Sequence, residues 1–388
     1  MYSRILEKKL INLSQKYPVV TMTGPRQSGK TTLVKAAFPD MPYASLEAPD
    51  VLEHAGADPR GFLGQFKDGV ILDEIQRLPE LLSYIQTIVD EKHRNGMFIL
   101  TGSQQLLMLD RVSQSLAGRT ALLRLLPLSL EELSANNIMP GTPAETLLTG
   151  GYPRIYDQSL EPAEWHANYT ATYVERDVRS IKNIGDLSLF TRFLRLCAGR
   201  SGQMLNMSEI GNECGITHNT VKSWLSVLEA SSIVFLLQPH FKNFNKRVVK
   251  SPKLYFLDTG LLCYLLNLRS ADAITVSPFK GHIFETFVVS EIVKHFCNRG
   301  EPAPVYFWRD KTGHEIDCLI DMNAELVPIE IKSGETIVPD FFKHITFWQK
   351  LSGESGRGFL VYGGESAQER GTVSVVPWRE MERIFLRQ

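Results

Sequence analysis

Cysteine is scarce in this 388-residue chain and follows no metal-binding or redox motif. The five cysteines are Cys197, Cys214, Cys263, Cys297 and Cys318. No two of them form a CxxC pair, so the spacing indicates neither a zinc site nor a disulfide framework. We therefore expect buried free thiols in a reducing compartment.

Strong net charge and long apolar runs are also absent. The formal net charge is −1, which neither favours nor excludes nucleic acid, because a basic patch can be hidden in a neutral total. No run reaches the roughly 18 apolar residues that span a bilayer, and the best, residues 121–130, is interrupted by Arg124. Residues 1–9 lack the apolar segment of a signal peptide. These absences predict a cytoplasmic protein with no membrane partner.

What is present is the composition of an ordinary soluble protein. Hydrophobic residues make up 43% of the chain, which is typical of globular domains. The length is sufficient for two or three domains, each with a core of its own. Function must therefore be sought in local motifs.

The first motif is a phosphate loop at residues 24–31, with two glycines separated by four residues and followed by Lys and Thr. Residues 18–23 before it predict a buried strand, and residues 31–37 after it predict a helix. Such a loop turns backbone N–H groups toward phosphate oxygens at a helix N-terminus. We expect Lys30 to contact the β- and γ-phosphates of ATP and Thr31 to ligate Mg²⁺. The residues expected to bind the nucleotide here are Gly24, Pro25, Arg26, Gln27, Ser28, Gly29, Lys30, Thr31 and Thr32.

The second motif is an apolar run over residues 69–72 that ends in two carboxylates, Asp73 and Glu74. This is the Walker B pattern, in which Asp73 would hold Mg²⁺ directly or through water. Glu74 would then polarise the attacking water. Burying two adjacent acids without a metal is costly, so the pair is hard to explain structurally. Together with the phosphate loop, it predicts a Mg²⁺-dependent ATPase in which Lys30 and Glu74 are catalytic.

A third buried strand, residues 97–100, ends in Thr101, Gly102 and Ser103. In ATPases that carry an added strand, a small hydroxyl residue at this point lies beside Walker B and orients the water as a sensor. We place Ser103 in that role. The alternative is a simple strand-to-helix turn in which Ser103 is an N-cap.

These motifs, with the segment 115–119, resemble a prokaryotic AAA-type P-loop ATPase family whose members carry a C-terminal domain of unknown function. The resemblance covers essentially the whole chain. It implies an arginine that completes the γ-phosphate shell, often from a neighbouring subunit, which makes a homo-oligomer one expected partner. Our candidate is Arg119, and Arg154, after the Gly150-Gly151 turn, competes for the role. The alternative for Arg119 is a surface arginine at a helix end.

The middle of the chain predicts a helix-turn-helix. A short helix over residues 208–214, Gly215 as the turn and a second helix from Ile216 give the pattern of a winged helix. The second helix would expose His218, Asn219 and Lys222. A basic stretch over residues 240–253 would form the wing and contact phosphates of double-stranded DNA. The alternative is a winged helix that serves only as a packing module.

The C-terminal part resembles the PD-(D/E)xK nuclease fold. Asp317, Glu330 and Lys332 occupy the motif positions, and Glu285 would be the helical acid. Period two in a strand places Glu330 and Lys332 on one face. The resemblance implies that Glu285, Asp317 and Glu330 hold Mg²⁺ while Lys332 orients the nucleophile. The residue before Asp317 is Ile316 rather than proline, a departure that the fold tolerates.

The sequence thus predicts an α/β protein with an AAA-type parallel sheet, a winged helix and a restriction-endonuclease-like α/β domain. The expected activity is Mg²⁺-dependent ATP hydrolysis by a motor or switch that acts on DNA. One alternative is an ATP-regulated DNA endonuclease, and another is a non-catalytic, nucleotide-gated scaffold. The predicted units are an ATPase domain at 1–136, a helical linker at 137–188, a winged helix at 189–258 and a nuclease-like domain at 259–388.

Overall fold

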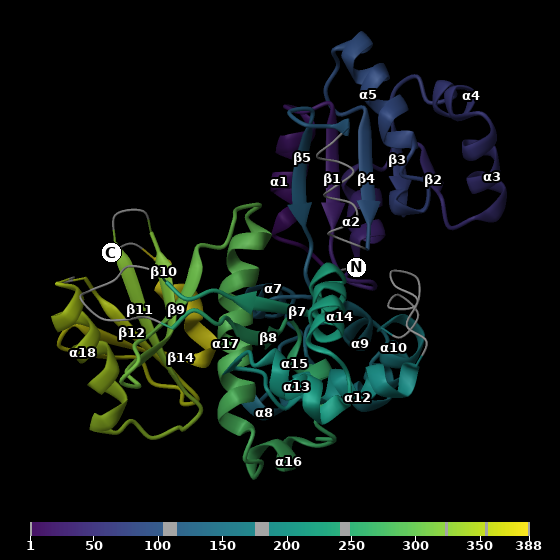
Figure 1. Ribbon diagram of the computed structural model, residues 1–388. Helices are drawn as coiled ribbons and strands as arrows, with labels where there is room; N and C mark the ends of the chain where they lie inside the picture. The colour runs from purple at the N-terminus through teal and green to yellow at the C-terminus, as the bar shows by residue number, and fades with distance from the viewer. Residues whose placement is uncertain are drawn as a thin grey trace.

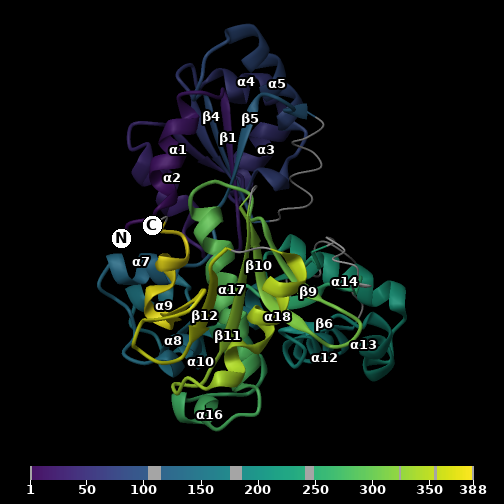
Figure 2. The same cartoon turned by 90° about the vertical axis from the view of Figure 1, so that its left-hand side faces the viewer.

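The structure is a computed structural model that describes residues 2–103, 115–174, 186–240, 249–322, 325–353 and 356–386. An N-terminal α/β unit lies above two further units that sit side by side beneath it (Figures 1 and 2). Of these two, the middle unit is mainly helical, and the C-terminal unit contains a mixed sheet.

The N-terminal unit contains a five-stranded sheet in the order β2-β3-β4-β1-β5. All of its pairings are parallel, with Val19 opposite both Phe98 on β4 and Thr120 on β5. β4 therefore lies between β1 and β3, which is the added strand expected from the sequence. The strands are β1 (Val19–Thr23), β2 (Tyr43–Ser45), β3 (Val70–Asp73), β4 (Phe98–Gly102) and β5 (Thr120–Arg124).

Helices cover both faces of this sheet. Successive residues of a strand point to opposite faces, so Val19 packs into one apolar core and Val20 into the other. One face is covered by α1 (Leu6–Ser14) and α2 (Lys30–Ala37). The other is covered by α3 (Pro49–Ala57), α4 (Pro59–Gly64) and α5 (Leu81–Lys92), which follows the 3-10 turn η1 (Ile75–Arg77).

A group of short helices links this sheet to the rest of the molecule. Two of them begin with a capping box, in which Ser129 pairs with Glu132 and Thr142 with Glu145. Residues 259–275, which we assigned to the nuclease-like domain, pack here, because α15 contacts α8 and α10 while α16 contacts α8. The helices are α7 (Leu130–Ala135), α8 (Pro143–Thr149), α9 (Pro153–Asp157), α10 (Pro162–Tyr169) with its π-helical continuation η2 (Thr170–Val174), α15 (Thr259–Leu265) and α16 (Ala271–Thr275).

The described residues between 187 and 256, which leave out 241–248, form three helices and a small antiparallel sheet in the order β6-β8-β7. In α14, Val221 is buried while His218, Asn219 and Lys222 are exposed, as the helical periodicity predicts. The central basic residues of the predicted wing, Lys242, Lys246 and Arg247, lie outside the described residues. The elements are α12 (Leu187–Ala198), β6 (Gln203–Met204), α13 (Met207–Cys214), α14 (His218–Ala230), β7 (Val234–Leu237) and β8 (Lys253–Phe256).

The C-terminal unit is a six-stranded mixed sheet in the order β13-β14-β12-β11-β10-β9, with helices on both faces. Residues on one face of the sheet pack with those of α17, and those on the other pack with α18. The strands are β9 (Val305–Arg309), β10 (Glu315–Asp321), β11 (Leu326–Lys332), β12 (Gly358–Tyr362), β13 (Gln368–Arg370) and β14 (Val373–Pro377). The helices are α17 (Lys280–Asn298), η3 (Pro339–Phe342), α18 (Lys343–Ser352) and η4 (Trp378–Ile384).

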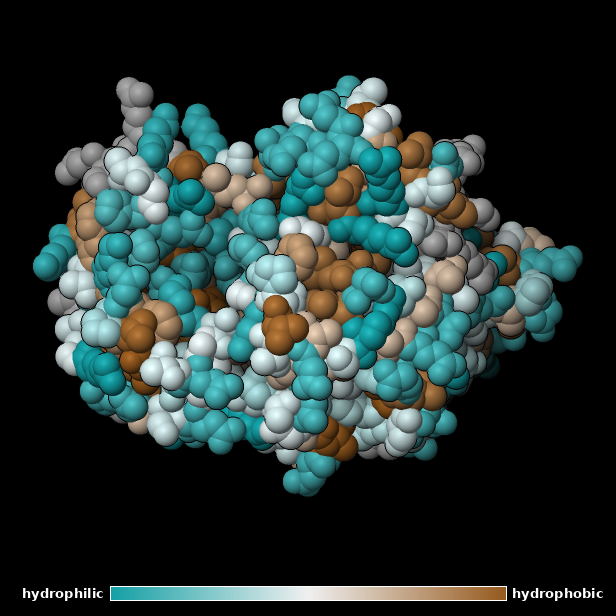
Figure 3. Space-filling view, turned by 90° about the horizontal axis from the view of Figure 1, so that it is seen from below, coloured by the Kyte–Doolittle hydropathy of each residue, from teal (hydrophilic) through white to brown (hydrophobic). Residues whose placement is uncertain are grey.

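Helix α17 joins the units through a buried ion pair. Lys294 Nζ lies 2.7 Å from Glu291 Oε1 and donates to Leu128 O at 3.2 Å, while Leu130 N donates to Glu291 Oε2 at 2.6 Å. A single apolar core continues from the middle unit into the C-terminal sheet. The face opposite the N-terminal sheet is largely hydrophilic, with scattered hydrophobic areas (Figure 3). Among the described residues, no helix is both long and apolar enough to cross a bilayer.

Candidate functional site

The phosphate loop curls between the end of β1 and the start of α2. Gly24 and Gly29 have φ angles of 145° and 93°, which side chains disfavour. A Cβ at position 24 would lie 2.0 Å from Leu125 O, so only glycine fits there. Lys30 Nζ donates to Gly24 O at 2.9 Å and to Pro25 O at 2.8 Å, which holds the ammonium inside the curl.

Asp73 lies against the loop at the same edge of the sheet. Thr31 Oγ1 donates to Asp73 Oδ2 at 2.9 Å, and the Tyr43 hydroxyl donates to the same oxygen at 2.7 Å. Thr101 donates to the other carboxylate oxygen. A hydroxyl and a carboxylate oxygen are the donors that Mg²⁺ prefers, so the side chains present fit the ion. Burial and the hydrogen bond to Asp73 raise the pKa of Tyr43.

Glu74 has a left-handed backbone, with φ 57° and ψ 43°. Such a conformation costs a non-glycine residue of order 1–3 kcal/mol and is concentrated at functional sites. The Gln76 amide donates to its carboxylate, and Ser103 Oγ donates to Glu74 Oε2 at 3.3 Å. Ser103 therefore touches the predicted catalytic acid. Whether Ser103 also caps a helix concerns residues 104–114, which lie outside the described part of the chain.

Arg119, our candidate for the γ-phosphate arginine, lies at the opposite edge of the sheet. Its carbonyl accepts from Val19 N at 3.2 Å, at the start of β1, whereas the phosphate loop follows the end of that strand. A five-residue strand separates the two edges by roughly 13–16 Å. Its guanidinium is paired with Asp90 at 2.6 and 2.8 Å. Arg119 is therefore far from the loop of the same chain, because parallel β5 places its first residues at the opposite edge of the sheet. A role for Arg119 in the site of a neighbouring subunit stays a prediction.

Arg154 lies at the nucleotide edge instead. A cavity of about 430 Å³, within the range of ligand sites, is lined by loop residues, by Glu74, and by Tyr2, Pro153 and Arg154. Arg154 is exposed, and in the described part of the chain its guanidinium has no hydrogen bond or ion pair. The predicted residues that line this cavity are Arg26, Gln27, Gly29, Lys30, Thr31, Thr32 and Glu74.

Arg4 binds the backbone of the phosphate loop through the carbonyl of Ser28. No sequence motif indicated this contact. The buried Arg4 guanidinium donates to Ser28 O at 2.8 Å, to Leu126 O at 2.7 Å and to Glu132 Oε1 at 3.0 Å. The loop is thus tied to α7, the first helix of the linking group. Tyr43 reaches Asp73 only through the pairing of β2 with β3, so no signal in the sequence indicated it. Gln76 lies two residues after Glu74, and no motif singled it out.

The C-terminal motif residues are brought together in part. Lys332 Nζ lies 2.6 Å from Glu330 Oε1 and 3.5 Å from Asp317 Oδ2, and Ile331 N donates to the same Asp317 oxygen at 2.9 Å. Burial and the neighbouring Asp317 carboxylate raise the pKa of Glu330 well above its usual range. Glu330 and Lys332 share a face, as their spacing predicts.

Glu285, however, is engaged by the middle unit. Lys253 Nζ, from β8, lies 2.9 Å from Glu285 Oε1 and also pairs with Glu315, while the Tyr255 hydroxyl donates to Glu285 Oε1 at 2.6 Å. Burial alone would lower the pKa of Lys253, but Tyr255 and the surrounding carboxylates raise it well above normal. Lys253 is therefore a buried cation among the acids.

The predicted Mg²⁺ site of Glu285, Asp317 and Glu330 is not formed. Among the described residues, no three His, Cys, Asp or Glu side chains are grouped so that they could hold a metal ion. Instead, Lys253 pairs with Glu285, and Lys332 lies between Glu330 and Asp317.

Comparison with protein families divides the chain into three matched regions. Residues 16–134 match the family described as AAA domain, so the N-terminal unit is an AAA-type P-loop domain. Residues 142–272 match a domain of unknown function, DUF8612, and residues 280–381 match another, DUF4143. The last of these matches begins at α17.

Two relatives of the chain carry the name uncharacterized protein. The chain is 29% identical to uncharacterized protein Rv2008c of Mycobacterium tuberculosis over 323 residues, which is 82% of this chain and 71% of the relative. It is 23% identical to uncharacterized protein MJ1637 of Methanocaldococcus jannaschii over 344 residues, 80% and 69% of the two chains.

Two solved structures overlap the chain in part. The Walker-type ATPase PABY2304 of Pyrococcus abyssi has a TM-score of 0.43 at 17% identity and covers 67% of this chain and 94% of its own. AMPPCP-bound DnaA from Aquifex aeolicus has a TM-score of 0.32 at 18% identity and covers 58% and 86%. At these scores neither likeness carries a conclusion about this protein.

The ion pairs of Lys253 give a prediction about stability. Lys253→Met should lower the free energy of unfolding by about 3–5 kcal/mol, because it leaves buried carboxylates without their cation. Urea unfolding measures this, with the exposed neighbour Lys250→Met as the matched control.

The destabilisation should also depend on pH. Burial already raises the pKa of Glu285, and the variant leaves it further above its unfolded value. The stability of the variant is therefore retained at low pH and falls as the pH rises through the folded pKa of Glu285. The difference in free energy of unfolding between wild type and variant should thus be smaller at about pH 5 than at about pH 8. If the difference in free energy of unfolding does not change with pH, Lys253 does not stabilise the ionised carboxylate of Glu285.

Proposed function

We propose that the protein binds MgATP at residues 24–32 and hydrolyses it, acting as an ATP-driven motor or switch. The observation that carries the proposal is the 2.9 Å contact between Thr31 Oγ1 and Asp73 Oδ2, with Glu74 beside it on the same edge. The two residues that would hold Mg²⁺ thus already lie together, although 42 positions separate them in sequence.

Each side chain has a role that its position supports. Lys30 would exchange the carbonyls of Gly24 and Pro25 for the β- and γ-phosphates. Mg²⁺ held by Thr31 and Asp73 would supply positive charge to the triphosphate. Glu74 would accept a hydrogen bond from the attacking water, and Gln76 and Ser103 would hold its carboxylate in place.

The cation that completes the site is Arg154 in this proposal. Its guanidinium lines the nucleotide cavity and is not engaged elsewhere in the described residues, whereas Arg119 is paired with Asp90. Because α9 carries Arg154 on the linking group of helices, its movement onto the γ-phosphate would pass the nucleotide state to the rest of the protein.

Double-stranded DNA is the proposed object of this switch. The support lies in α14, where His218, Asn219 and Lys222 are exposed at the N-terminal end of the second helix. Gly215, with φ 74°, makes the turn before it, and Thr217 caps the helix. The endonuclease alternative is less favoured, because Lys253 of the middle unit pairs with Glu285, the helical acid of its predicted metal site.

Substitutions at Lys30 and Glu74 test the ATPase. Lys30→Ala removes charge-assisted hydrogen bonds worth about 1.5–3 kcal/mol, so the Kd for ATP should rise by roughly 10- to 100-fold. Glu74→Gln should keep nucleotide binding but lower kcat by about 10²–10⁴. Phosphate release and fluorescent-nucleotide binding measure the two effects. Wild-type turnover in both variants would refute the assignment.

Arginine substitutions separate the two candidates. Arg154→Ala should lower kcat on the order of 10²–10³-fold, the cost of losing one donor to developing charge. Arg119→Ala should leave kcat nearly unchanged. The reverse result, with a dependence of turnover on protein concentration, would mean that Arg119 acts on the site of a second copy.

A charge reversal tests the DNA role. Lys222→Glu should weaken binding of a labelled duplex and flatten the dependence of log K on log salt by about 0.9 for each phosphate that the protein no longer neutralises. Fluorescence anisotropy at several salt concentrations measures this, with the exposed Lys92→Glu on α5 as the control. Identical salt slopes for the two variants would remove α14 from the DNA surface.

A further inference from the structure

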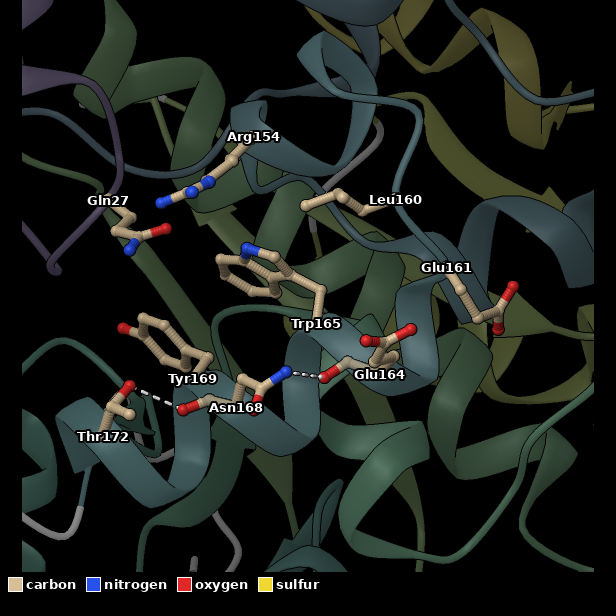
Figure 4. Close-up of a pocket in the computed structure, with 9 residues that line it drawn as sticks. All are labelled: Gln27, Arg154, Leu160, Glu161, Glu164, Trp165, Asn168, Tyr169 and Thr172. Carbon is tan, nitrogen blue, oxygen red and sulfur yellow. Dashed lines mark hydrogen bonds between the residues drawn. The ribbon is translucent and has the colours of Figure 1, made fainter.

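A second pocket opens beside the nucleotide cavity. It has a volume of about 240 Å³ and shares Gln27 and Arg154 with the larger cavity, while the rest of its wall comes from Leu160 and helix α10 with its π-helical continuation (Figure 4). Pockets for drug-sized ligands measure about 300–1,000 Å³. This pocket therefore suits a single side chain better than a nucleotide.

The floor of the pocket is aromatic. The rings of Trp165 and Tyr169 stack with centroids 4.9 Å apart at 17°, and Tyr152 packs against both. The hydroxyls of Tyr152 and Tyr169 are 3.0 Å apart. The electron-rich faces of such rings attract cations, Trp most strongly.

The wall beyond Trp165 is acidic. Glu161, the N-cap of α10, and Glu164, in the first turn of the helix, are exposed and line the pocket. The Glu161 carboxylate also accepts from Ala163 N at 3.4 Å. The Glu164 carboxylate has no hydrogen bond or ion pair in the described residues. These charges repel phosphates and nucleic acid and favour a positively charged ligand. A guanidinium group can interact with both the aromatic floor and the acidic wall, since it stacks on aromatic rings and donates bidentate hydrogen bonds to carboxylates.

Arg154 lines both this pocket and the nucleotide cavity. Figure 4 shows its guanidinium directed toward Gln27 and the phosphate loop, away from the two glutamates. A second cation in the pocket would take up the carboxylates and repel Arg154 toward the phosphates. Conversely, ATP would draw Arg154 away and leave the pocket with net negative charge.

We propose that this pocket binds an arginine side chain of a partner protein, and that its occupation and ATP binding strengthen each other through Arg154. The coupling rests on the role proposed for Arg154 above, whereas the pocket itself does not. Such coupling is reciprocal, so each ligand changes the affinity of the other by the same factor. The helix continues from the pocket as a π-helix at Thr170–Val174, an irregularity common at functional sites.

The experiment uses the full chain and a capped Gly-Gly-Arg-Gly-Gly peptide, with the citrulline peptide as a neutral isostere. Isothermal titration calorimetry should detect the arginine peptide and not the citrulline one. Saturating peptide should lower the Kd for a non-hydrolysable ATP analogue by at least about 5-fold, the lower end of typical allosteric coupling.

Variants assign the effect to the pocket. The double variant Glu161→Gln, Glu164→Gln should fail to bind the peptide, whereas Glu53→Gln, an exposed acid on α3, should still bind it. Arg154→Ala should bind the peptide but show no coupling to nucleotide.

Three results would overturn the proposal: equal binding of the citrulline peptide, full binding by the double glutamine variant, or peptide binding that leaves the ATP affinity of wild type unchanged. Free arginine binding as tightly as the peptide would overturn the assignment to a partner protein. A wild type that binds the peptide through Glu161 and Glu164 but never binds nucleotide would refute the proposed ATPase and leave the pocket assignment standing.

Discussion

The candidate site depends on one constraint, which is that β1, β3 and β4 run parallel and end at the same edge of one sheet. Parallel neighbours bring the residues that follow each strand together, however far apart they are in sequence. Asp73 thereby meets Thr31, and Glu74 meets Ser103. The same rule explains why Arg119 is distant, because it precedes its strand and lies at the other edge.

The nucleotide cavity is closed by parts of the chain outside the sheet. Arg4 donates to the Ser28 carbonyl and pairs with Glu132, so it connects the phosphate loop to α7, the first of the linking helices. Arg154, on the next part of the same linking group, faces the front of the loop. A change in the loop on binding phosphate would therefore act on the linking helices from both sides. Their contact with α17 through Glu291 and Lys294 extends this connection to the C-terminal unit.

The sequence predicted those features that lie in contiguous residues. The loop at 24–31 and the acids at the end of β3 each occupy one short segment, and the parallel sheet around them follows from apolar strands alternating with helices. Tyr43 and Arg4 could not be predicted, because each acts on a residue from another element. Lys253 was predicted to lie in the basic wing at 240–253, whereas it is buried and pairs with Glu285 and Glu315. Lys253 is the hardest case, since lysine is almost never fully buried unless it is paired, and its partners lie 32 and 62 positions away.

The nuclease-like motif predicts which residues share a face of a strand, but it does not predict which charged groups of other elements reach them. Alternation on β11 placed Glu330 and Lys332 together, whereas the pairing of Glu285 with a lysine of the middle unit could not be predicted from the motif. Here Lys253 enters from β8 and Lys332 folds back onto Glu330, so the charges are balanced from within the protein. Removing the buried Lys253 ammonium would leave the Glu285 carboxylate without its cation, which is strongly destabilising. Lys253, Glu285 and Glu315 therefore form a contact that joins the middle unit to the C-terminal unit.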